Sequence, residues 1–533
     1  MSADARTAAN AIDAAGLGAD IKELSSDAYE GRGPATAGDV KARAWLVQQL
    51  KTIGYEPGGV DGSYEQPVDI VGIASKMPKQ WSFRGPAGKQ PVSLKFGEQY
   101  AGVGGLQQPQ VSISNAEVVF AGYGIQAPEY QWDDFKGQDL KGKILLLLNN
   151  DPDWDDALFL GPVRLYYGRW MYKYESAARQ GAAGAIIIHT TPSAGYPWQV
   201  VRTSWGGEQF ELPAGDEPRL QVKTWVTEDA AAQLAALGGQ DLTKLIAAAK
   251  SRDFQPVPLG VTTSLRFTST ISKKTTANVA GLLRGSDPQL GREVVIYTAH
   301  HDHLGIGEPD KTGDRIYNGA VDNASGVAQV LALARAFKAL PAAPRRSVLM
   351  LLVAGEEQGL LGSQYYAEHP TFAAGRIAAN INFDTANLYG AAADLVFVGK
   401  GKSTLDAVVE KYAAVQHRKV KPDQMVDRGF FYRSDQLNFA RIGVPAFYMH
   451  RAMEFIGKPE GWGKQQYEEY EAQRYHQPSD EFNPDWNYDG IIADTQLAFW
   501  VGLDVANADA LPAWRPGDEF EAARKAALAD REP

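Results

Sequence analysis

The feature that most constrains the fold is a regular alternation of apolar strands and helices from about residue 275 onward. Apolar runs typical of buried strands, such as REVVIYTAH, RSVLMLLVA and RIAANINFD, alternate with helical segments such as SGVAQVLALARAFKAL and TLDAVVEKYAAV. Alternation of this kind predicts a largely parallel sheet with helices on both faces. Ligands should then gather at the carboxyl ends of the strands.

The rest of the chain divides into two blocks. Residues 1–55 carry apolar positions at helical spacing, and residues 65–112 have the pattern of short strands and turns. From about residue 113 the runs VVFAGYGI, GKILLLLNN and GAAGAIIIHT suit strands, with YGRWMYKYESAARQG as a helix between the last two. We therefore divide the 533 residues into parts 1–112, 113–256 and 257–533, within the two to four domains that about 150 residues per domain would suggest.

Composition excludes several classes of protein. The net charge of -11 and the lack of any Lys/Arg run argue against a nucleic-acid binder. The sequence has no cysteine, which excludes disulfides, thiolate zinc sites and a cysteine nucleophile, so any metal must use histidine and carboxylates. No apolar stretch of ~18 residues predicts a membrane span.

The first residues, MSADARTAANAIDAAG, have neither the basic nor the apolar region of a signal peptide. We expect a periplasmic or secreted protein whose signal peptide has been removed, and a cytoplasmic location stays open.

Five short segments place a histidine or a carboxylate where the predicted sheet would gather its ligands. The segments TAHHDHLG, NGAVDNASGVA, AGEEQGLLGS, NFD and YHQPSDEF supply His300, Asp322, Glu356, Glu357, Asp384 and His476. Three of the segments follow directly on an apolar strand, one precedes a helix, and the last is a polar loop. Because strand ends on one sheet converge, we expect these side chains to meet in space.

This set of nitrogen and oxygen ligands suits zinc, with Co²⁺ or Mn²⁺ as substitutes. Two divalent ions ~3.5–4 Å apart need a bridging carboxylate, and water between them becomes acidic enough to attack a carbonyl near neutral pH. Asp302 lies two residues after His300, on the same side of an extended chain, so it could orient that histidine through its other ring nitrogen.

Each piece alone also has an ordinary interpretation. A lone histidine beside a strand is usually structural, paired glutamates usually belong to a solvated loop, and DNASG alone is an ordinary helix start. We keep the ordinary interpretation for His303, His369, His417 and His450, and assign them no ligation. The ordered set of segments, rather than any one member, indicates a metal site.

In that order, the five segments resemble the metal motifs of the co-catalytic zinc aminopeptidase family, whose members include relatives of glutamate carboxypeptidase II and bacterial leucyl-type zinc aminopeptidases. The opening LSSDAYEGRGPATAGDVKARAWLVQQLKTIGYEP also looks like the start of that family, and the block 113–256 resembles a protease-associated domain inserted in such a peptidase. The resemblance implies a three-layer α/β/α catalytic domain with a mostly parallel mixed sheet, plus a mainly-β insert.

The resemblance implies a role for each position. His300 and Asp384 would complete one zinc site, Glu357 and His476 would complete the other, and Asp322 would bridge both, giving two Zn²⁺ per subunit. Members that lose these ligands keep the fold without activity, and this chain keeps all of them.

The proton-transfer groups are implied in the same way. Glu356 would be the general base that takes a proton from the bridging water and passes it to the leaving amine, while Asp302 would hold His300 in orientation. Tyr475, directly before the last ligand, and Tyr432 are two candidate donors to the oxyanion. A packed aromatic ring with a solvated hydroxyl is an equally good interpretation of either tyrosine.

One loop departs from the family pattern. RSDQLNFARIGVPAF resembles a loop that often reads Ser-Asp-His, and here Gln436 stands at the histidine position. This departure puts one pocket contact in doubt and leaves the metal ligands untouched.

The sequence therefore predicts a di-zinc metallopeptidase, most simply an aminopeptidase that acts as an exopeptidase on short peptides, and a homodimer is compatible with the resemblance. An acidic loop could offer a carboxylate to a substrate ammonium, although a solvated loop is the simpler interpretation of Glu308, Asp310 and Asp314.

The main alternative is a carboxypeptidase or amidohydrolase on acidic or acylated substrates. Its carboxylate clamp would come from Arg433, Arg441 or Arg451, which we interpret first as surface or capping arginines. A glutaminyl cyclase and a non-catalytic binding protein are further alternatives.

Overall fold

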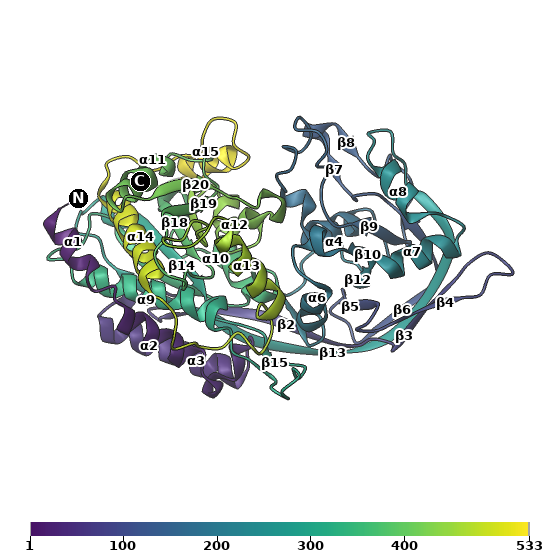
Figure 1. The fold of residues 1–533 in the computed structure, drawn as a ribbon, viewed down its shortest axis with the longest axis horizontal. Helices are drawn as coiled ribbons and strands as arrows, with labels where there is room; N and C mark the ends of the chain where they lie inside the picture. Colours follow the sequence, from purple (N-terminus) through teal and green to yellow (C-terminus); the bar gives the residue numbers. More distant parts are fainter. Residues whose placement is uncertain (1, 531–533) are drawn as a thin grey trace. The chain divides into compact units, whose positions relative to one another are not determined.

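The computed structural model describes residues 2–530, which form two compact units, and Figure 1 shows the course of the chain. The first unit takes its described residues from Met1–Asp69, Thr275–Gln424 and Arg433–Pro533. The second consists of Ile70–Lys274 and Met425–Tyr432. The predicted insert 113–256 lies inside the second unit, and its identification as a protease-associated domain stays a prediction.

The first unit is built on a mixed sheet with parallel central strands. In chain order, its strands are β1 (Glu56–Pro57), the last part of β13 (Val257–Leu283), β14 (Val294–His300), β17 (Ser347–Val353), β18 (Ile377–Phe383), β19 (Asp394–Val398), β20 (Lys419–Pro422) and β21 (Ala446–His450). β14 lies between β17 and β18 and is parallel to both, and β21 is parallel to β18. β13 is antiparallel to β17, and β19 is antiparallel to β21. The predicted α/β class with a mostly parallel mixed sheet is thereby confirmed.

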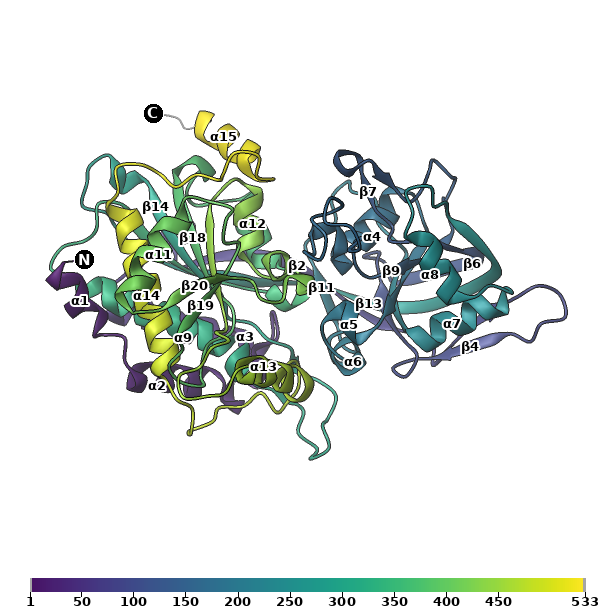
Figure 2. The ribbon, with the colours of Figure 1, turned by 45° about the horizontal axis from the view of Figure 1, so that its top comes forward.

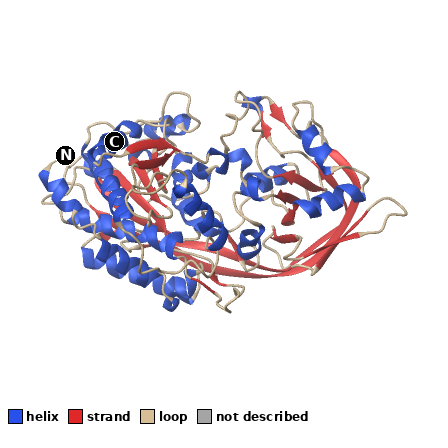
Figure 3. Cartoon of the chain, viewed as in Figure 1, coloured by secondary structure: helices blue, strands red, loops and turns tan. Residues whose placement is uncertain are grey.

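Helices cover both faces of this sheet (Figures 2 and 3). The helices of the first unit are α1 (Ala3–Ala9), α2 (Ala14–Leu24), α3 (Ala37–Ile53), α9 (Ser325–Lys338), α10 (Leu361–Glu368), α11 (Leu405–Val415), α12 (Gln436–Arg441), α13 (Trp462–Gln473), α14 (Asp489–Asn507) and α15 (Glu521–Ala529). Residues 1–55 thus contain the helices α1, α2 and α3, as the helical spacing of their apolar residues predicted.

Alternation along the strands shows how the layers are made. In β14, Val295 and Tyr297 pack with α2, α9 and α14, whereas Val294 and Ile296 pack with α10 and α12. Every residue of β14, β17 and β18 is buried, which explains why these strands are continuous apolar runs.

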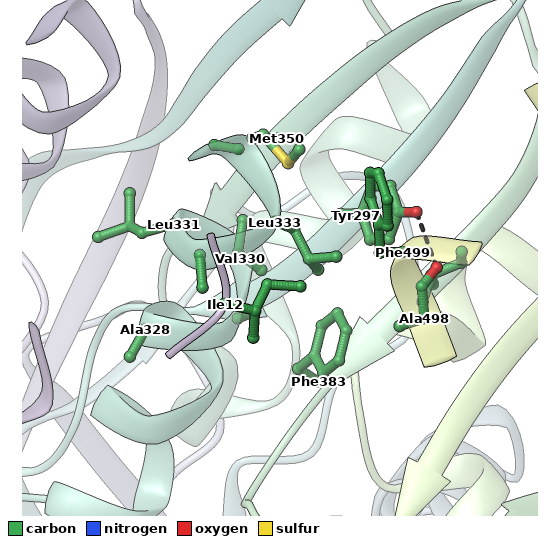
Figure 4. Packing of buried hydrophobic residues seen from close by; sticks show 14 of the residues in the cluster. Ile12, Tyr297, Ala328, Val330, Leu331, Leu333, Met350, Phe383, Ala498 and Phe499 are labelled. Atoms are coloured by element: carbon green, nitrogen blue, oxygen red, sulfur yellow. Dashed lines mark hydrogen bonds between the residues drawn. The ribbon is translucent and has the colours of Figure 1, made fainter. Parts of the chain in front are cut away.

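The larger of the two cores lies between the sheet and α2, α9, α11 and α14 (Figure 4). There the hydroxyl of Tyr297 donates to the carbonyl of Ala498 at 2.9 Å, so the buried ring satisfies its polar atom on α14. Gly502 on the same helix allows this approach, because a Cβ there would lie 1.8 Å from the Tyr297 hydroxyl oxygen.

The second unit contains its own parallel strands. Its elements are β3 (Gln80–Arg84), β4 (Val92–Lys95), β5 (Tyr100–Gly104), β6 (Gln110–Phe120), β7 (Gln126–Ala127), β8 (Trp132–Asp133), β9 (Ile144–Leu148), α4 (Trp170–Arg179), β10 (Gly184–His189), α5 (Thr191–Ala194), α6 (Trp198–Ser204), β11 (Gln209–Glu211), β12 (Val222–Thr227), α7 (Glu228–Leu237) and α8 (Leu242–Ala249). β6, β9, β10 and β12 pair in parallel in that order, and β5 pairs antiparallel with β12. The predicted helix between the strands is α4.

β13 and β2 (Glu65–Lys76) were not expected as long strands. Each runs from one unit into the other, and β13 extends over 27 residues. Among residues 2–530, no helix combines the length and apolar character needed to cross a membrane.

Candidate metal centre

The carboxyl ends of the central strands bring the first group of predicted ligands together. His300 is the last residue of β14, and Asp384 directly follows β18. Nε2 of His300 lies 3.2 Å from Oδ1 of Asp322 and 3.5 Å from Oδ1 of Asp384. One nitrogen and two oxygens therefore face a common point, and all three side chains are mostly buried.

A second group lies against the other oxygen of Asp322. Nε2 of His476 is 3.4 Å from Oδ2 of Asp322 and 2.9 Å from Oε2 of Glu357. The structure thus brings the five predicted ligands together as two groups that share Asp322. Metal binding by these five residues stays a prediction.

The loop that carries Asp322 is held by a residue that the sequence did not single out. The carboxylate of Asp480 accepts the N–H of Asp322 at 3.0 Å and the N–H of Val321 at 3.2 Å. Its main-chain carbonyl accepts the N–H of Ala320 at 2.9 Å. Since Asp480 stands four residues after His476, one polar loop supplies a candidate ligand and also supports the shared carboxylate.

Asp302 fixes the loop that follows β17. Its Oδ1 accepts the N–H of Glu356 at 3.1 Å, and its Oδ2 accepts the N–H of Glu357 at 3.4 Å. Towards His300, the main-chain carbonyl of Asp302 lies 3.3 Å from Nδ1 and its Oδ1 lies 3.7 Å from the same atom. Asp302 therefore lies beside His300 and holds the backbone of both glutamates, and its role in orienting His300 stays a prediction.

Glu356 lies beside the predicted ligands and is not one of the five. Its Oε2 is 3.9 Å from Nε2 of His300. Burial raises the pKa of the Glu356 carboxyl well above its usual range, although the charge of His300 opposes the shift. A carboxylate with a raised pKa is a stronger proton acceptor, which suits a group that takes a proton from water.

His303 belongs to the site although the sequence analysis assigned it no ligation. Its Nδ1 lies 2.6 Å from Oε1 of Glu357, and the atoms of His303, Asp322 and Glu357 are close enough to hold a metal. The other oxygen of Glu357 faces His476, so two imidazoles fix the orientation of one carboxylate. The signal that could have found it is the spacing of TAHHDHLG, in which His303 follows Asp302.

The buried carboxylates dominate the electrostatics of the site. Burial alone would lower the pKa of His476, but the charges of Glu357 and Asp322 outweigh it and raise the pKa to about 10. Burial alone would raise the pKa of Glu357, but the charge of His476 lowers it to about 2. The cluster therefore draws positive charge into a buried place, which is the property a cation site needs.

The donor set fits zinc. Nε2 of His300 is buried and makes no hydrogen bond with any of the residues that the structure describes, yet it faces two carboxylate oxygens. An unpartnered imidazole nitrogen among carboxylates is the arrangement that a divalent ion with nitrogen and oxygen ligands would complete.

The two candidate oxyanion donors lie in different units. Tyr475 belongs to the first unit, where its ring stacks on His476 with centroids 3.9 Å apart and its hydroxyl accepts from Nη2 of Arg433 at 3.4 Å. Tyr432 belongs to the second unit and is buried against Phe431 and Tyr166. The structure brings Tyr475 next to a candidate ligand, and a catalytic role for either tyrosine stays a prediction.

The acidic loop after His300 makes local hydrogen bonds of the kind found in solvated loops. The carboxylate of Asp310 accepts the N–H groups of Thr312 and Asp314, at 2.7 and 3.1 Å, which makes a local turn. Glu308 is exposed. These contacts are those of a solvated loop between β15 (Gly305–Ile306) and β16 (Ile316–Tyr317).

The three arginines considered for a carboxylate clamp differ in position. Arg441 is exposed at the end of α12, and Arg451 is buried with its guanidinium 4.0 Å from the centre of the Tyr470 ring. Arg433, beside Tyr475, is the one next to a candidate site residue. At the position where relatives often have histidine, Gln436 accepts from Nδ2 of Asn382 at 2.9 Å.

Parts of the chain match known proteins. Residues 278–500 match the family model described as peptidase family M28. A probable zinc metalloprotease of Pyrenophora tritici-repentis is 39% identical over 109 residues, which are 20% of this chain and 24% of that protein. The corresponding protein of Pyrenophora teres f. teres is 40% identical over 107 residues, 20% of this chain and 22% of that protein. The matched region thus spans about a quarter of the length of these curated relatives.

Two solved structures share the fold over nearly the whole chain. The aminopeptidase from Aneurinibacillus sp. strain AM-1 has a TM-score of 0.53 at 20% identity, covering 96% of this chain and 97% of that one. A peptidase M28 precursor from Shewanella amazonensis has a TM-score of 0.50 at 18% identity, with coverage of 96% and 97%.

Proposed function

From the match of residues 278–500 to the model of peptidase family M28, we propose that the protein is a di-zinc exopeptidase that hydrolyses peptide bonds near one end of short peptides. In the reaction, water adds to the carbonyl carbon, the C–N bond breaks, and the products are a carboxylate and an amine. The candidate metal centre lies inside the matched span.

One observation carries the proposal. The two carboxylate oxygens of Asp322 face two different imidazoles, with Oδ1 3.2 Å from Nε2 of His300 and Oδ2 3.4 Å from Nε2 of His476. Asp384 joins the first group and Glu357 the second. A carboxylate shared between two nitrogen and oxygen groups is the arrangement expected of a bridging ligand between two ions.

When bound, zinc would supply a Lewis acid that polarises the substrate carbonyl and makes water more acidic. Glu356 supplies the proton transfer: its Oε2 lies 3.9 Å from Nε2 of His300, and its main chain is fixed by Asp302. It would accept a proton from the attacking water and return it to the leaving nitrogen.

Tyr475 supports the same reaction from the other side of His476. Its stacked ring holds the hydroxyl beside the centre, and Arg433 donates to that hydroxyl. A hydroxyl that receives a hydrogen bond from a cation can donate its own proton more strongly, which suits an oxyanion donor.

The choice of the amino-terminal end of the substrate rests on the acidic balance of the chain, with a net charge of -11. A surface rich in carboxylates attracts a free ammonium group. Glu356→Gln, with exposed Glu368→Gln on α10 as matched control, tests the reaction. Hydrolysis of amino-acid anilides and dipeptides should fall by about 10²–10⁴-fold in the first variant, with zinc content unchanged, and stay the same in the second.

The specificity is tested with blocked substrates. The zinc-loaded protein should cleave peptides with a free amino terminus and spare their N-acetylated forms. Cleavage of the blocked peptides alone would contradict the aminopeptidase assignment while leaving the hydrolytic centre intact.

A second candidate function has one observation in its favour. Arg433 lies beside Tyr475, where a guanidinium could bind the carboxylate of a carboxypeptidase substrate or of an acidic acyl group. If this is its role, Arg433→Ala should raise KM for substrates with a free carboxyl terminus far more than for their amides. Equal effects on both would remove this candidate.

A further inference from the structure

A buried arginine from the N-terminal segment lies against the backbone of the candidate metal centre. Arg32 ends a short 3-10 segment of the first unit, is 1% exposed, and lies outside the span that matches the peptidase family. Its guanidinium donates to four main-chain carbonyls. The acceptors, with their distances, are His301 at 2.9 Å, Leu24 at 2.8 Å, Asn318 at 2.6 Å and Gly319 at 3.0 Å.

Three of these carbonyls belong to the segments that carry candidate ligands. His301 directly follows His300, and Asn318 and Gly319 directly precede the loop that presents Asp322. Arg32 therefore ties two ligand-bearing segments to each other and, through Leu24, to the end of α2.

The main chain of Arg32 adds a contact to the same place. Its carbonyl accepts the N–H of His303 at 3.3 Å, and the ring of His303 contacts Glu357. Gly31 permits this close approach, because its φ is 67° and a Cβ there would lie 2.5 Å from the carbonyl oxygen of Gly305.

The charge of Arg32 also faces the centre. Burial lowers the pKa of the guanidinium to about 10, while the carboxylates of Asp302, Asp480 and Asp322 act to raise it, so it remains a cation at neutral pH. Among the ion pairs of residues 2–530, none includes Arg32. Its cost of burial is offset by the carbonyls and by the field of the centre, which distinguishes it from an arginine that serves a single salt bridge.

Arg346 provides the contrast within the same unit. It is as deeply buried, and it donates to the carbonyl of Val505 at 2.9 Å, but it forms an ion pair with Glu293 at 2.7 Å and contacts no segment that carries a candidate ligand. It is an ordinary structural arginine and a matched control.

We propose that Arg32 is a positioning residue of the metal centre, whose guanidinium fixes the backbone that presents His300 and Asp322. The inference rests on the proposed zinc site, and it extends that site to an arginine 269 residues before His301. Arg32 touches no reacting atom in this account; it acts through the ligands. Supporting groups of this kind change metal affinity by about 10–100-fold.

The test compares Arg32→Met and Arg32→Lys with Arg346→Met and the unchanged protein. Zinc affinity is measured by competition with a chromophoric chelator, the visible absorption spectrum is recorded after loading with Co²⁺, and unfolding is followed by circular dichroism. The Arg32→Met variant should bind zinc about 10–100-fold more weakly and show an altered cobalt spectrum. Arg32→Lys should lie between it and the unchanged protein, because one ammonium keeps the charge but cannot reach all four carbonyls.

The control separates positioning from folding. Arg346→Met should lose stability while keeping the zinc affinity and cobalt spectrum of the unchanged protein. The inference is overturned if Arg32→Met, or Arg32→Lys where the methionine variant does not fold, keeps both properties, or if Arg346→Met loses zinc affinity equally. Failure of the unchanged protein to bind zinc would overturn the proposed function and this inference with it.

Discussion

Replacing Asp302 by asparagine should weaken the metal centre as well as the fold. Asp302 is fully buried, and its two oxygens accept the N–H groups of Glu356 and Glu357 at 3.1 and 3.4 Å. Asparagine has nearly the same volume but presents one NH₂ group where the aspartate has an acceptor. One of the two N–H groups then loses its partner and meets a donor.

The size of the effect follows from these contacts. A hydrogen bond to a charged group contributes about 1.5–3 kcal/mol, so the loss of one bond should lower the free energy of unfolding by about 2–3 kcal/mol. Displacement of Glu357 should also weaken zinc binding by about 10–100-fold.

Asp394 offers a matched control. It is equally buried, and its carboxylate accepts the N–H groups of Met453 and Glu454, at 3.1 and 2.8 Å, away from the candidate ligands. Urea unfolding of chelator-treated protein should show similar losses for Asp302→Asn and Asp394→Asn. Chelator competition should show weaker zinc binding for Asp302→Asn alone, and unchanged zinc affinity in that variant would refute the reasoning.

Three further predictions concern separate parts of the first unit. Burial, assisted by the charges of Arg451 and Arg433, lowers the pKa of His450 from 6.5 to about 3. Between these pH values the unfolded chain binds a proton at His450 and the folded protein does not. The contribution of His450 to stability is therefore complete above pH 6.5 and is lost as the pH falls towards 3. At pH 4.5 the loss should be about 2–3 kcal/mol in chelator-treated protein, and it should be absent from urea titrations of His450→Gln. Tyr475→Phe should lower kcat by about 10²-fold with little change in KM or zinc content, whereas an unchanged kcat would assign the hydroxyl a packing role. Gly502→Ala should lower the free energy of unfolding by about 2–3 kcal/mol, because the new Cβ would meet the Tyr297 hydroxyl, and a neutral result in denaturant titrations would contradict the packing of α14 on β14.

The sequence predicted the elements that are determined by local pattern. β14, β17 and β18 are fully buried on both faces, so their sequences are unbroken apolar runs that can be recognised without knowledge of their partners. Parallel strands bring their carboxyl ends to one edge, and this topological rule was sufficient to expect His300, Glu357 and Asp384 close together.

The full length of β13 could not be predicted from local sequence pattern. Its middle reads TSTISKKTT, which is polar and has no apolar alternation long enough to indicate a strand of 27 residues. β13 is extended because it pairs with β6 in one unit, with β17 in the other, and also with β2, and these partners lie far away in the sequence. Tertiary pairing overrides local propensity here.

The supporting residues of the candidate centre were also beyond the sequence. Arg32, His303 and Asp480 act on the ligands through main-chain groups or through the second oxygen of a ligand carboxylate. Such contacts leave no spacing rule, because a carbonyl or an N–H belongs to every residue type. Only the fold reveals that Arg32 donates to the carbonyl of His301, 269 residues away.

The central claim is that Asp322 is shared by two metal ions, one with His300 and Asp384 and the other with Glu357 and His476. A crystal structure of zinc-loaded protein, with anomalous data collected on both sides of the zinc absorption edge, tests it most directly. Two anomalous peaks are expected, one on each side of the Asp322 carboxylate. A single peak that leaves one oxygen of Asp322 without metal, or zinc bound by other residues, would contradict it.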